Sequence, residues 1–297
     1  MTLVELVLAE SRRLKDAGVS FGHGTANAFD EAAWLVTWAL GLPLDALDSR
    51  GARELEPAEQ AKAEALVEQR IATRKPAAYL TGEAWLQDIP FTIDERAIVP
   101  RSYIAELLVD AEESGTLDAW LSERTRPVLD LCTGNGSLAV IAALAYPEIE
   151  VTASDVSPAA LELARLNVER HALGSRITVV ESDLFERVGG PFDLILCNPP
   201  YVTDANMAAL PEEYRAEPAL ALAGGADGMD LIRRIVAEAP RRMSDDAVLV
   251  LEVGRERAAF ERAFPRLECA WLETGGGGDC VVLASRDALV RTSAARR

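Results

Sequence analysis

Hydrophobic positions recur at two different spacings along the chain, and the change between them divides the sequence into parts. Over residues 3–19 and 31–44, apolar side chains repeat every three or four positions, as on one face of a helix. Pro57 suits the first turn of a further helix that runs to Thr73. These spacings predict a small helical N-terminal domain over residues 1–80.

A short extended segment follows the predicted helices. Its sequence, AWLQDIPFTIDERAIV, spans residues 84–99 and contains a turn-like Asp94-Glu95 pair. This pattern predicts a hairpin linker over residues 81–99.

From about Pro100 onward, short apolar runs alternate with helical stretches. The runs are PVLDLC, VTASD, ITVVESD, FDLILCN, AVLVLEV, LECAWLE and CVVLAS. Strands that alternate with helices need crossover connections, which produce a parallel, doubly wound sheet. The last two runs are joined by GGGGD, a turn short enough for an antiparallel hairpin. We therefore predict an α/β domain over residues 100–297, with a mostly parallel seven-stranded sheet and an antiparallel C-terminal hairpin.

Composition narrows the classes of protein. The chain has 297 residues, 49% hydrophobic and 26% charged, with a net charge of −18. Such acidity argues against sequence-independent binding of duplex DNA, because that binding depends on Lys and Arg neutralising phosphates. The apolar runs are too short to span a membrane, and the N-terminus lacks the order of a signal peptide. Four cysteines without CxxC spacing indicate reduced, buried thiols in a cytoplasmic protein.

A glycine turn marks the first candidate site. The run PVLDLC leads into TGNGSLA, in which Gly134, Gly136 and Ala139 match the pattern G-x-G-x-x-G/A. Asp155 lies 21 residues beyond Gly134, at the end of the next predicted strand. This context predicts a nucleoside site with the acid on the ribose hydroxyls. The structural alternative is a tight turn that happens to use glycine.

Two more acids bear on which nucleoside binds. Asp130 lies at the carboxyl end of the first strand of the sheet, where its carboxylate would repel a pyrophosphate. S-adenosyl-L-methionine has a ribose and an ammonium group but no phosphate, and Asp183 is placed to accept from its adenine amino group. Three acids at three strand ends favour this cofactor over NAD, although each acid alone is also explained as a helix cap or a loop residue.

The second candidate site is Asn198-Pro199-Pro200-Tyr201, directly after the run FDLILC. Two prolines remove two backbone donors and leave carbonyl oxygens as acceptors at a strand end. Asn198 adds a side-chain acceptor, and Tyr201 adds an aromatic face. The group therefore suits a planar amino group, with two acceptors for its two hydrogens. The structural alternative is a strand ended by proline with a capping Asn.

DLCTGNG followed by NPPY resembles the class I, Rossmann-like methyltransferases that use S-adenosyl-L-methionine to modify planar amino groups. These include adenine-N6 DNA methyltransferases and HemK-type protein-glutamine methyltransferases. The helical N-terminus, the hairpin linker and the run IVPRSYIAELL resemble the glutamine family. The resemblance implies catalytic roles for Asn198, Pro199 and Tyr201 and amide contacts from Pro200 and Arg101. It implies cofactor contacts from Asp130, Thr133, Gly134, Asn135, Gly136, Asp155, Val156, Asp183, Leu184 and Asn198.

Two protein substrates compete within that family: a glutamine of large-subunit ribosomal protein L3 and the glutamine of the release-factor GGQ loop. AYLTGEAWLQDIPFTIDERAIVPRS and WLETGGGGDCVVL resemble the ribosomal-protein branch, which usually has proline where Tyr103 stands here. Adenine-N6 methylation is a more distant alternative that the acidity disfavours. An NAD-dependent oxidoreductase and a non-enzymatic nucleoside-binding module are further alternatives.

Three other residues carry separate expectations. Arg101 lies either over the methionine carboxylate of the cofactor or in a surface salt bridge. His23 and His171 are the only histidines in the sequence, and both lie away from the motifs. We therefore expect neither a histidine general base nor a histidine-based metal site.

Overall fold

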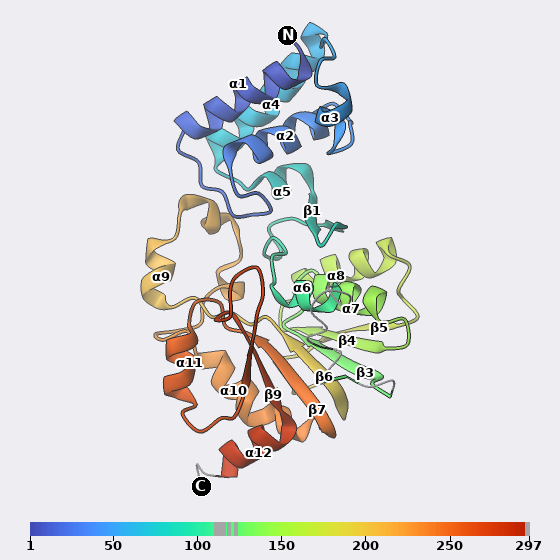
Figure 1. Ribbon diagram of the computed structural model, residues 1–297, viewed down its shortest axis with the longest axis vertical. Helices are drawn as coiled ribbons and strands as arrows, with labels where there is room; N and C mark the ends of the chain where they lie inside the picture. The colour runs from blue at the N-terminus through green and yellow to red at the C-terminus, as the bar shows by residue number, and fades with distance from the viewer. Residues whose placement is uncertain (110–116, 118–119, 122–123, 295–297) are drawn as a thin grey trace.

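Helices and strands follow the order expected from the sequence (Figure 1). A computed structural model describes residues 1–109, 117, 120–121 and 124–294. The N-terminal part consists of helices only, and the three predicted ones are present together with two short ones that the spacing did not reveal. They are α1 (Leu3–Asp16), α2 (Ala28–Ala39), α3 (Ala46–Arg50), α4 (Pro57–Thr73) and α5 (Ala77–Thr81).

Local chemistry explains where α1 begins. Thr2 Oγ1 accepts from the Glu5 N–H at 3.3 Å, and the Thr2 N–H donates to Glu5 Oε2 at 2.8 Å. This reciprocal capping box satisfies two donors that the first turn leaves free. Leu3, Leu6 and Leu14 form part of the buried face of the helix.

The hairpin linker is present. Strands β1 (Glu83–Leu86) and β2 (Ile89–Thr92) pair antiparallel, and Gln87 and Asp88 join them with φ of 50° and 59°. Positive φ at both central residues matches the twist of a two-residue hairpin. Gln-Asp is not a typical pair for such a turn, so no pattern in the sequence marked it. The turn-like Asp94-Glu95 pair forms a separate turn after β2, in which the Ala97 N–H donates to the Asp94 carbonyl oxygen at 3.2 Å and the Arg96 N–H donates to the Asp94 carboxylate at 3.0 Å.

The seven predicted strands form one sheet in the order β5-β4-β3-β6-β7-β9-β8. The first five in that order run parallel, and β9 pairs antiparallel with both β7 and β8, as the GGGGD turn predicted. The strands are β3 (Pro127–Leu131), β4 (Glu150–Asp155), β5 (Ile177–Glu181), β6 (Phe192–Cys197), β7 (Met243–Glu252), β8 (Ala270–Leu272) and β9 (Val281–Ser285).

Helices cover both faces of the sheet (Figure 1). Alternate strand residues face opposite sides, so Leu194 and Leu196 lie in one apolar core while Ile195 and Cys197 lie in the other. The first core includes α6 (Ile104–Val109) and α7 (Ser137–Ala145), and α8 (Pro158–Arg170) packs beside them. The second core is covered by α10 (Asp230–Glu238), α11 (Arg257–Ala263) and α12 (Arg286–Ala294).

A third apolar core joins the N-terminal helices to the rest of the chain. It contains residues of α1, α2 and α4, of the segment around β2, and Ala160 and Leu163 of α8. Helix α9 (Asp204–Ala209) and the 3-10 turns η1 (Glu212–Ala216) and η2 (Ala219–Ala221) follow the NPPY motif, and η3 (Ala239–Arg241) follows α10. In Figure 1 the α9 segment lies between the N-terminal helices and α11.

Two predictions from composition can be compared with this fold. The four cysteines are all free, but Cys132 and Cys269 are only half-buried, whereas Cys197 and Cys280 are buried as expected. Within the described ranges, the structure contains no helix that is both long and apolar enough to cross a membrane.

Candidate active site

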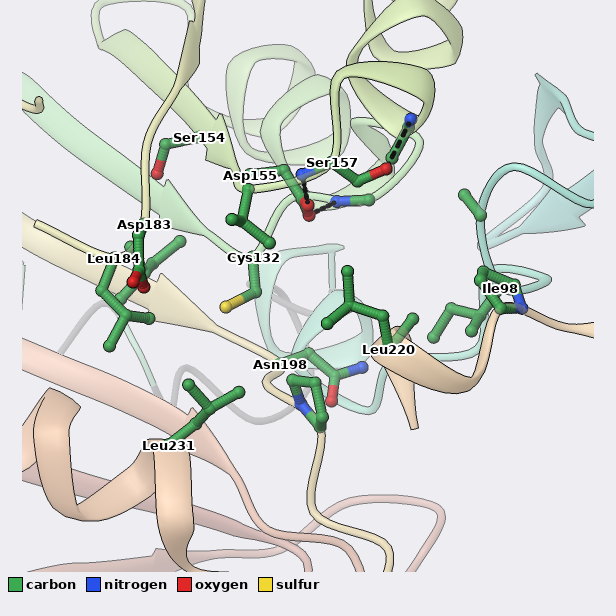
Figure 2. Close-up of a pocket in the computed structure, with 18 of the residues that line it drawn as sticks. Ile98, Cys132, Ser154, Asp155, Ser157, Asp183, Leu184, Asn198, Leu220 and Leu231 are labelled. Carbon is green, nitrogen blue, oxygen red and sulfur yellow. Dashed lines mark hydrogen bonds between the residues drawn. The ribbon is translucent and has the colours of Figure 1, made fainter. Parts of the chain in front are cut away.

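A cavity of about 270 Å³ opens at the carboxyl ends of the central parallel strands (Figure 2). The chain order reverses at β3, which lies between β4 and β6, and open α/β sheets bind ligands at such a point. The predicted residues Gly134, Asp155, Val156, Asp183, Leu184, Asn198 and Pro200 all line this cavity.

The glycine turn brings the chain close to a neighbouring helix. Gly134 and Gly136 have φ of 56° and 81°, the left-handed region that glycine occupies without strain. A Cβ on Gly136 would lie 3.2 Å from Ala164 Cα in α8, whereas a Cβ on Gly134 would meet nothing within 4 Å. Gly136 is therefore required by packing as well as by backbone shape.

Asp155 connects this turn to the end of β4. Its Oδ2 accepts from the Gly134 N–H at 2.9 Å, and its Oδ1 accepts from the Ser157 N–H at 2.9 Å. Burial raises the pKa of this carboxyl, and the backbone N–H groups oppose the rise. Both oxygens keep accepting capacity at the cavity wall, which suits the hydroxyls of a ribose.

One end of the cavity carries an acid beside apolar side chains. Leu184 and Leu231 line the cavity there, and Figure 2 shows Asp183 beside Leu184 at this end. Arg234 Nη2 of α10 lies 3.0 Å from Asp183 Oδ1. No pattern in the sequence marked Arg234, because a basic residue on an amphipathic helix is ordinarily a solvated one.

Asp130 is placed differently from what the sequence predicted. It is fully buried and does not line the cavity, because its side chain points from β3 toward α7. Its Oδ2 accepts from Thr133 Oγ1 and from the Ala139 N–H at 3.0 Å. Burial raises the pKa of Asp130 to about 7, against the lowering effect of these two donors. The Asp130 carboxylate therefore holds the glycine turn from the side of α7. It does not lie at the cavity mouth, so the prediction that it would repel a pyrophosphate there was wrong.

Thr133, Asn135 and Gly136 also lie behind the cavity wall rather than on it. Three buried polar atoms around the turn have no hydrogen-bond partner in the described part of the chain: Asp130 Oδ1, Asn135 Nδ2 and Ser154 Oγ. Buried polar groups are nearly always paired, so these three atoms are exceptions close to the turn.

The NPPY motif separates this cavity from a second one. The second cavity measures about 200 Å³ and is lined by Ile98, Arg101, Asn198, Pro199, Tyr201, Val202, Leu210, Tyr214, Ala221 and Leu222. Ile98, Asn198 and Ala221 line both cavities. The Asn198 side chain therefore lies at the boundary between the two cavities, and Figure 2 shows it beside the first.

Tyr201 is held in place by two contacts that the sequence did not reveal. Its hydroxyl donates to Glu252 Oε1 at 3.1 Å, and a Cβ on Gly254 would lie 2.4 Å from the Tyr201 ring. Burial and the neighbouring Glu252 raise the pKa of Tyr201 well above its usual value, so the phenol stays neutral. Glu252 also accepts from Ser102 Oγ at 2.6 Å and from the Tyr103 N–H at 2.9 Å. In the sequence, the signal for this contact was that an acidic residue, Glu252, interrupts the apolar run AVLVLEV.

Arg101 forms a salt bridge, but not at the surface. Its Nη1 and Nη2 donate to Glu217 Oε1 and Oε2 at 2.6 and 2.7 Å, and its guanidinium lies 5.6 Å from the centre of the Tyr214 ring. Arg101 lines the second cavity and not the first. Because the Glu217 side chain is fully buried, the pair is not the surface salt bridge that was one of the two expectations for this residue.

The two histidines differ. His171 Nε2 lies 2.9 Å from the Pro90 carbonyl oxygen, which fits the structural role expected of it. His23, which lies away from the motifs in the sequence, comes close to the second cavity in the structure. Its Nε2 lies 3.6 Å from Glu217 Oε2, behind the second cavity, although His23 itself lines neither cavity. The contact between His23 and Glu217 joins residues almost 200 positions apart in the sequence, and no local pattern predicts such a contact.

Among the described residues, no cluster of side chains could hold a metal ion.

Comparisons with known proteins agree with this geometry. Residues 112–214 match the family model described as Methyltransferase small domain, and residues 9–82 match the PrmC N-terminal domain. The ribosomal protein uL3 glutamine methyltransferase of Bordetella pertussis is 50% identical over 97% of this chain and 96% of its own length. The protein of the same name from Burkholderia pseudomallei is 47% identical over 95% and 94%.

Among solved structures, the chain is similar to the catalytic domain of hMettl16 in complex with the MAT2A 3'UTR hairpin 6. The TM-score is 0.52 at 14% identity, covering 77% of this chain and 81% of that one. At this identity the similarity supports the fold alone.

Proposed function

The chain belongs to the family of ribosomal protein uL3 glutamine methyltransferases, and from that premise we propose how its own residues carry out the reaction. The reaction is methyl transfer from S-adenosyl-L-methionine to the side-chain amide nitrogen (N5) of a glutamine in ribosomal protein uL3. The observation that carries this proposal is the position of Asn198 and Pro199. Their oxygens belong to a motif that separates a nucleoside-sized cavity from a smaller one.

The first cavity fits S-adenosyl-L-methionine. Asp155 would accept from the ribose hydroxyls, and Asp183 from the adenine amino group, while Val156 and Leu184 add apolar surface to the same cavity. Ser154 also lines this cavity, although its Oγ is itself buried. When bound, this cofactor supplies an activated methyl group on a sulfonium, with a neutral thioether as leaving group.

The second cavity would receive the glutamine side chain. An amide nitrogen is a poor nucleophile, because its lone pair is delocalised into the carbonyl. Asn198 Oδ1 and the Pro199 carbonyl oxygen would accept its two N–H bonds and orient the lone pair toward the first cavity. They would also stabilise the positive charge that develops on nitrogen, as an oxyanion hole does for negative charge. Tyr201, a neutral ring fixed by Glu252, would pack on the amide plane and add a cation–π contribution.

The reaction needs no histidine base. The carbon–sulfur bond of the methyl donor breaks as the carbon–nitrogen bond forms, and the methylated, protonated amide is acidic enough to lose its proton to water. Holding nitrogen and methyl in line, at the distance of a near-attack conformer, provides much of the remaining rate.

We assign substrate selection to the helical residues 1–80, linked through 81–99 to the methyltransferase domain over 100–297. The loop between α1 and α2 reaches the back of the second cavity, since His23 contacts Glu217 there. The acidic charge of −18 favours a protein partner over a nucleic acid, and a ribosomal protein would be met in the cytoplasm during ribosome assembly.

Mass spectrometry of two purified proteins tests the substrate. We expect incubation with S-adenosyl-L-methionine to add one methyl group to one glutamine of uL3, and none to the release factor. The Asn198→Ala variant should leave uL3 unmodified over the same time. Methylation of the GGQ glutamine with uL3 untouched would instead assign the release-factor activity to this chain.

A further inference from the structure

Arg101 and Tyr214 form one part of the wall of the second cavity. Both line the cavity, and the Arg101 guanidinium lies 5.6 Å from the centre of the Tyr214 ring. Glu217 fixes the guanidinium through both of its oxygens and also accepts from the Val99 N–H at 2.9 Å. The position of this wall is therefore set by one buried carboxylate.

The loop between α1 and α2 reaches that carboxylate from the N-terminal helices. His23 is 1% exposed, and its Nε2 lies 3.6 Å from Glu217 Oε2. The His23 and Tyr214 rings lie 4.2 Å apart between centres. Gly22 packs at the same place, since a Cβ there would lie 3.1 Å from the Tyr214 hydroxyl oxygen. Residues of the loop thus contact Glu217 and Tyr214 from behind the wall.

A second buried glutamate ties the same segment to the same helices. Glu213 Oε1 accepts from the Ser20 N–H at 2.9 Å and from Arg74 Nη1 at 3.2 Å. Arg70, with no exposed surface, approaches Glu213 Oε1 to 3.5 Å and donates to Glu31 and to the Ser20 carbonyl oxygen at 2.8 Å each. A buried charge that loses its partner is strongly unfavourable, so these contacts fix η1 while the N-terminal helices are docked.

We infer that His23 is a positioning residue for methyl transfer, and that the N-terminal helices complete the amide pocket as well as selecting the protein. This inference rests on the proposed function of the second cavity. His23 touches neither the substrate nor the cofactor. It acts through Glu217 and Tyr214, whose positions decide how the amide lies against Asn198. A misplacement of about 1 Å can slow a positioned reaction by on the order of 100-fold, so the effect belongs in kcat.

Steady-state kinetics with uL3 distinguish a positioning role of His23 from a role of the N-terminal helices in substrate docking alone. We expect His23→Leu to lower kcat at saturating uL3 by on the order of 10-fold to 100-fold, with the Kd of S-adenosyl-L-methionine unchanged. His23→Gln, which keeps a polar group of similar reach, should recover much of the loss. The matched control is His171→Leu, because the His171 Nε2 lies 2.9 Å from the Pro90 carbonyl oxygen and His171 lines neither cavity. It should leave kcat unchanged.

A second variant guards against misfolding. Arg74→Gln removes one contact to Glu213 from a side chain that is 27% exposed, so the fold should tolerate it. We expect a smaller decrease of kcat in the same direction. Wild-type kcat in both His23→Leu and Arg74→Gln, with a raised KM for uL3 only, would overturn the inference and leave the helices a docking role. The wild-type activity tests the proposed function separately, and the ratio of variant to wild-type kcat is measured on whichever protein glutamine the wild type methylates.

Discussion

Asn198 is the polar member of the three residues that line both cavities, and its environment explains why its type matters. Its backbone ends the buried strand β6, so the side chain emerges at the rim of the sheet. The neutral Asn198 amide offers one hydrogen-bond acceptor at this place. A carboxylate here would be a further negative group, and it would compete with Asp155 and Asp183 for the cationic ligand.

Replacing Asn198 with Ala therefore removes one of two acceptors for the substrate amide. By comparison with the loss of one oxyanion-hole donor, kcat should fall on the order of 10²–10³-fold with the cofactor Kd largely kept. Steady-state rates with uL3 and calorimetric titration of the cofactor measure the two quantities. Asn206→Ala, at an exposed position in α9, serves as the control and should behave as wild type. Equal losses of rate and cofactor affinity would show that Asn198 serves the cofactor or the fold.

The positions of single site residues could be predicted where a polar side chain comes at or just after the end of a predicted strand. Asp155, Asp183 and Asn198 each lie at the end of a strand or just after it, and all three line the cavity. Asp130 obeys the same rule but points to the other side of β3, because side chains alternate along a strand. Glu252 and His23 escaped prediction for a different reason: their partners lie far away in the chain, at Tyr201 and Glu217.

At the scale of elements, the glycine turn before α7 is the feature most sensitive to substitution. Gly136→Ala places a Cβ 3.2 Å from Ala164 Cα, and both variants Gly136→Ala and Gly134→Ala force a left-handed backbone on alanine. The backbone alone costs about 1–2 kcal/mol, so Gly134→Ala should lower stability by that amount. Gly136→Ala should lower it further, by about another 1 kcal/mol or more. Urea unfolding of the two variants side by side measures the difference, and equal midpoints would contradict the packing argument.

Elements were predictable where one pattern dominated. The seven apolar runs became seven strands of one sheet. The LECAWLE run produced only the three-residue strand β8, because it lies at the sheet edge and pairs with β9 alone. The turn that joins β1 to β2 had no signal in the sequence, because Gln87 and Asp88 adopt positive φ without being residues that favour it.

At the scale of the whole molecule, Glu217 joins the N-terminal helices to the catalytic part, and its charge makes that junction sensitive to acid. Burial raises the pKa of Glu217, but His23 and Arg101 outweigh burial and lower it to about 2. A folded-state pKa below the unfolded one means that the carboxylate stabilises the fold fully above about pH 4.5. That contribution should be lost progressively as the pH falls from about 4.5 to 2.

Thermal unfolding across that range measures the effect. The gap in Tm between wild type and Glu217→Gln should be largest above pH 5 and should shrink as the pH falls. The matched control is Glu150→Gln, at an exposed carboxyl, which should show little gap at any pH. A gap that stays constant down to pH 2 would show that Glu217 acts through shape and not through charge.

The central claim is that a glutamine amide binds between Asn198 and Pro199 while the cofactor occupies the adjoining cavity. A crystal structure with S-adenosylhomocysteine and a peptide carrying the target glutamine tests it most directly. We predict the amide nitrogen within hydrogen-bond distance of Asn198 Oδ1 and the Pro199 carbonyl oxygen, with the nucleoside beside Asp155. A glutamine bound outside the second cavity, or those two oxygens turned from its nitrogen, would contradict the account.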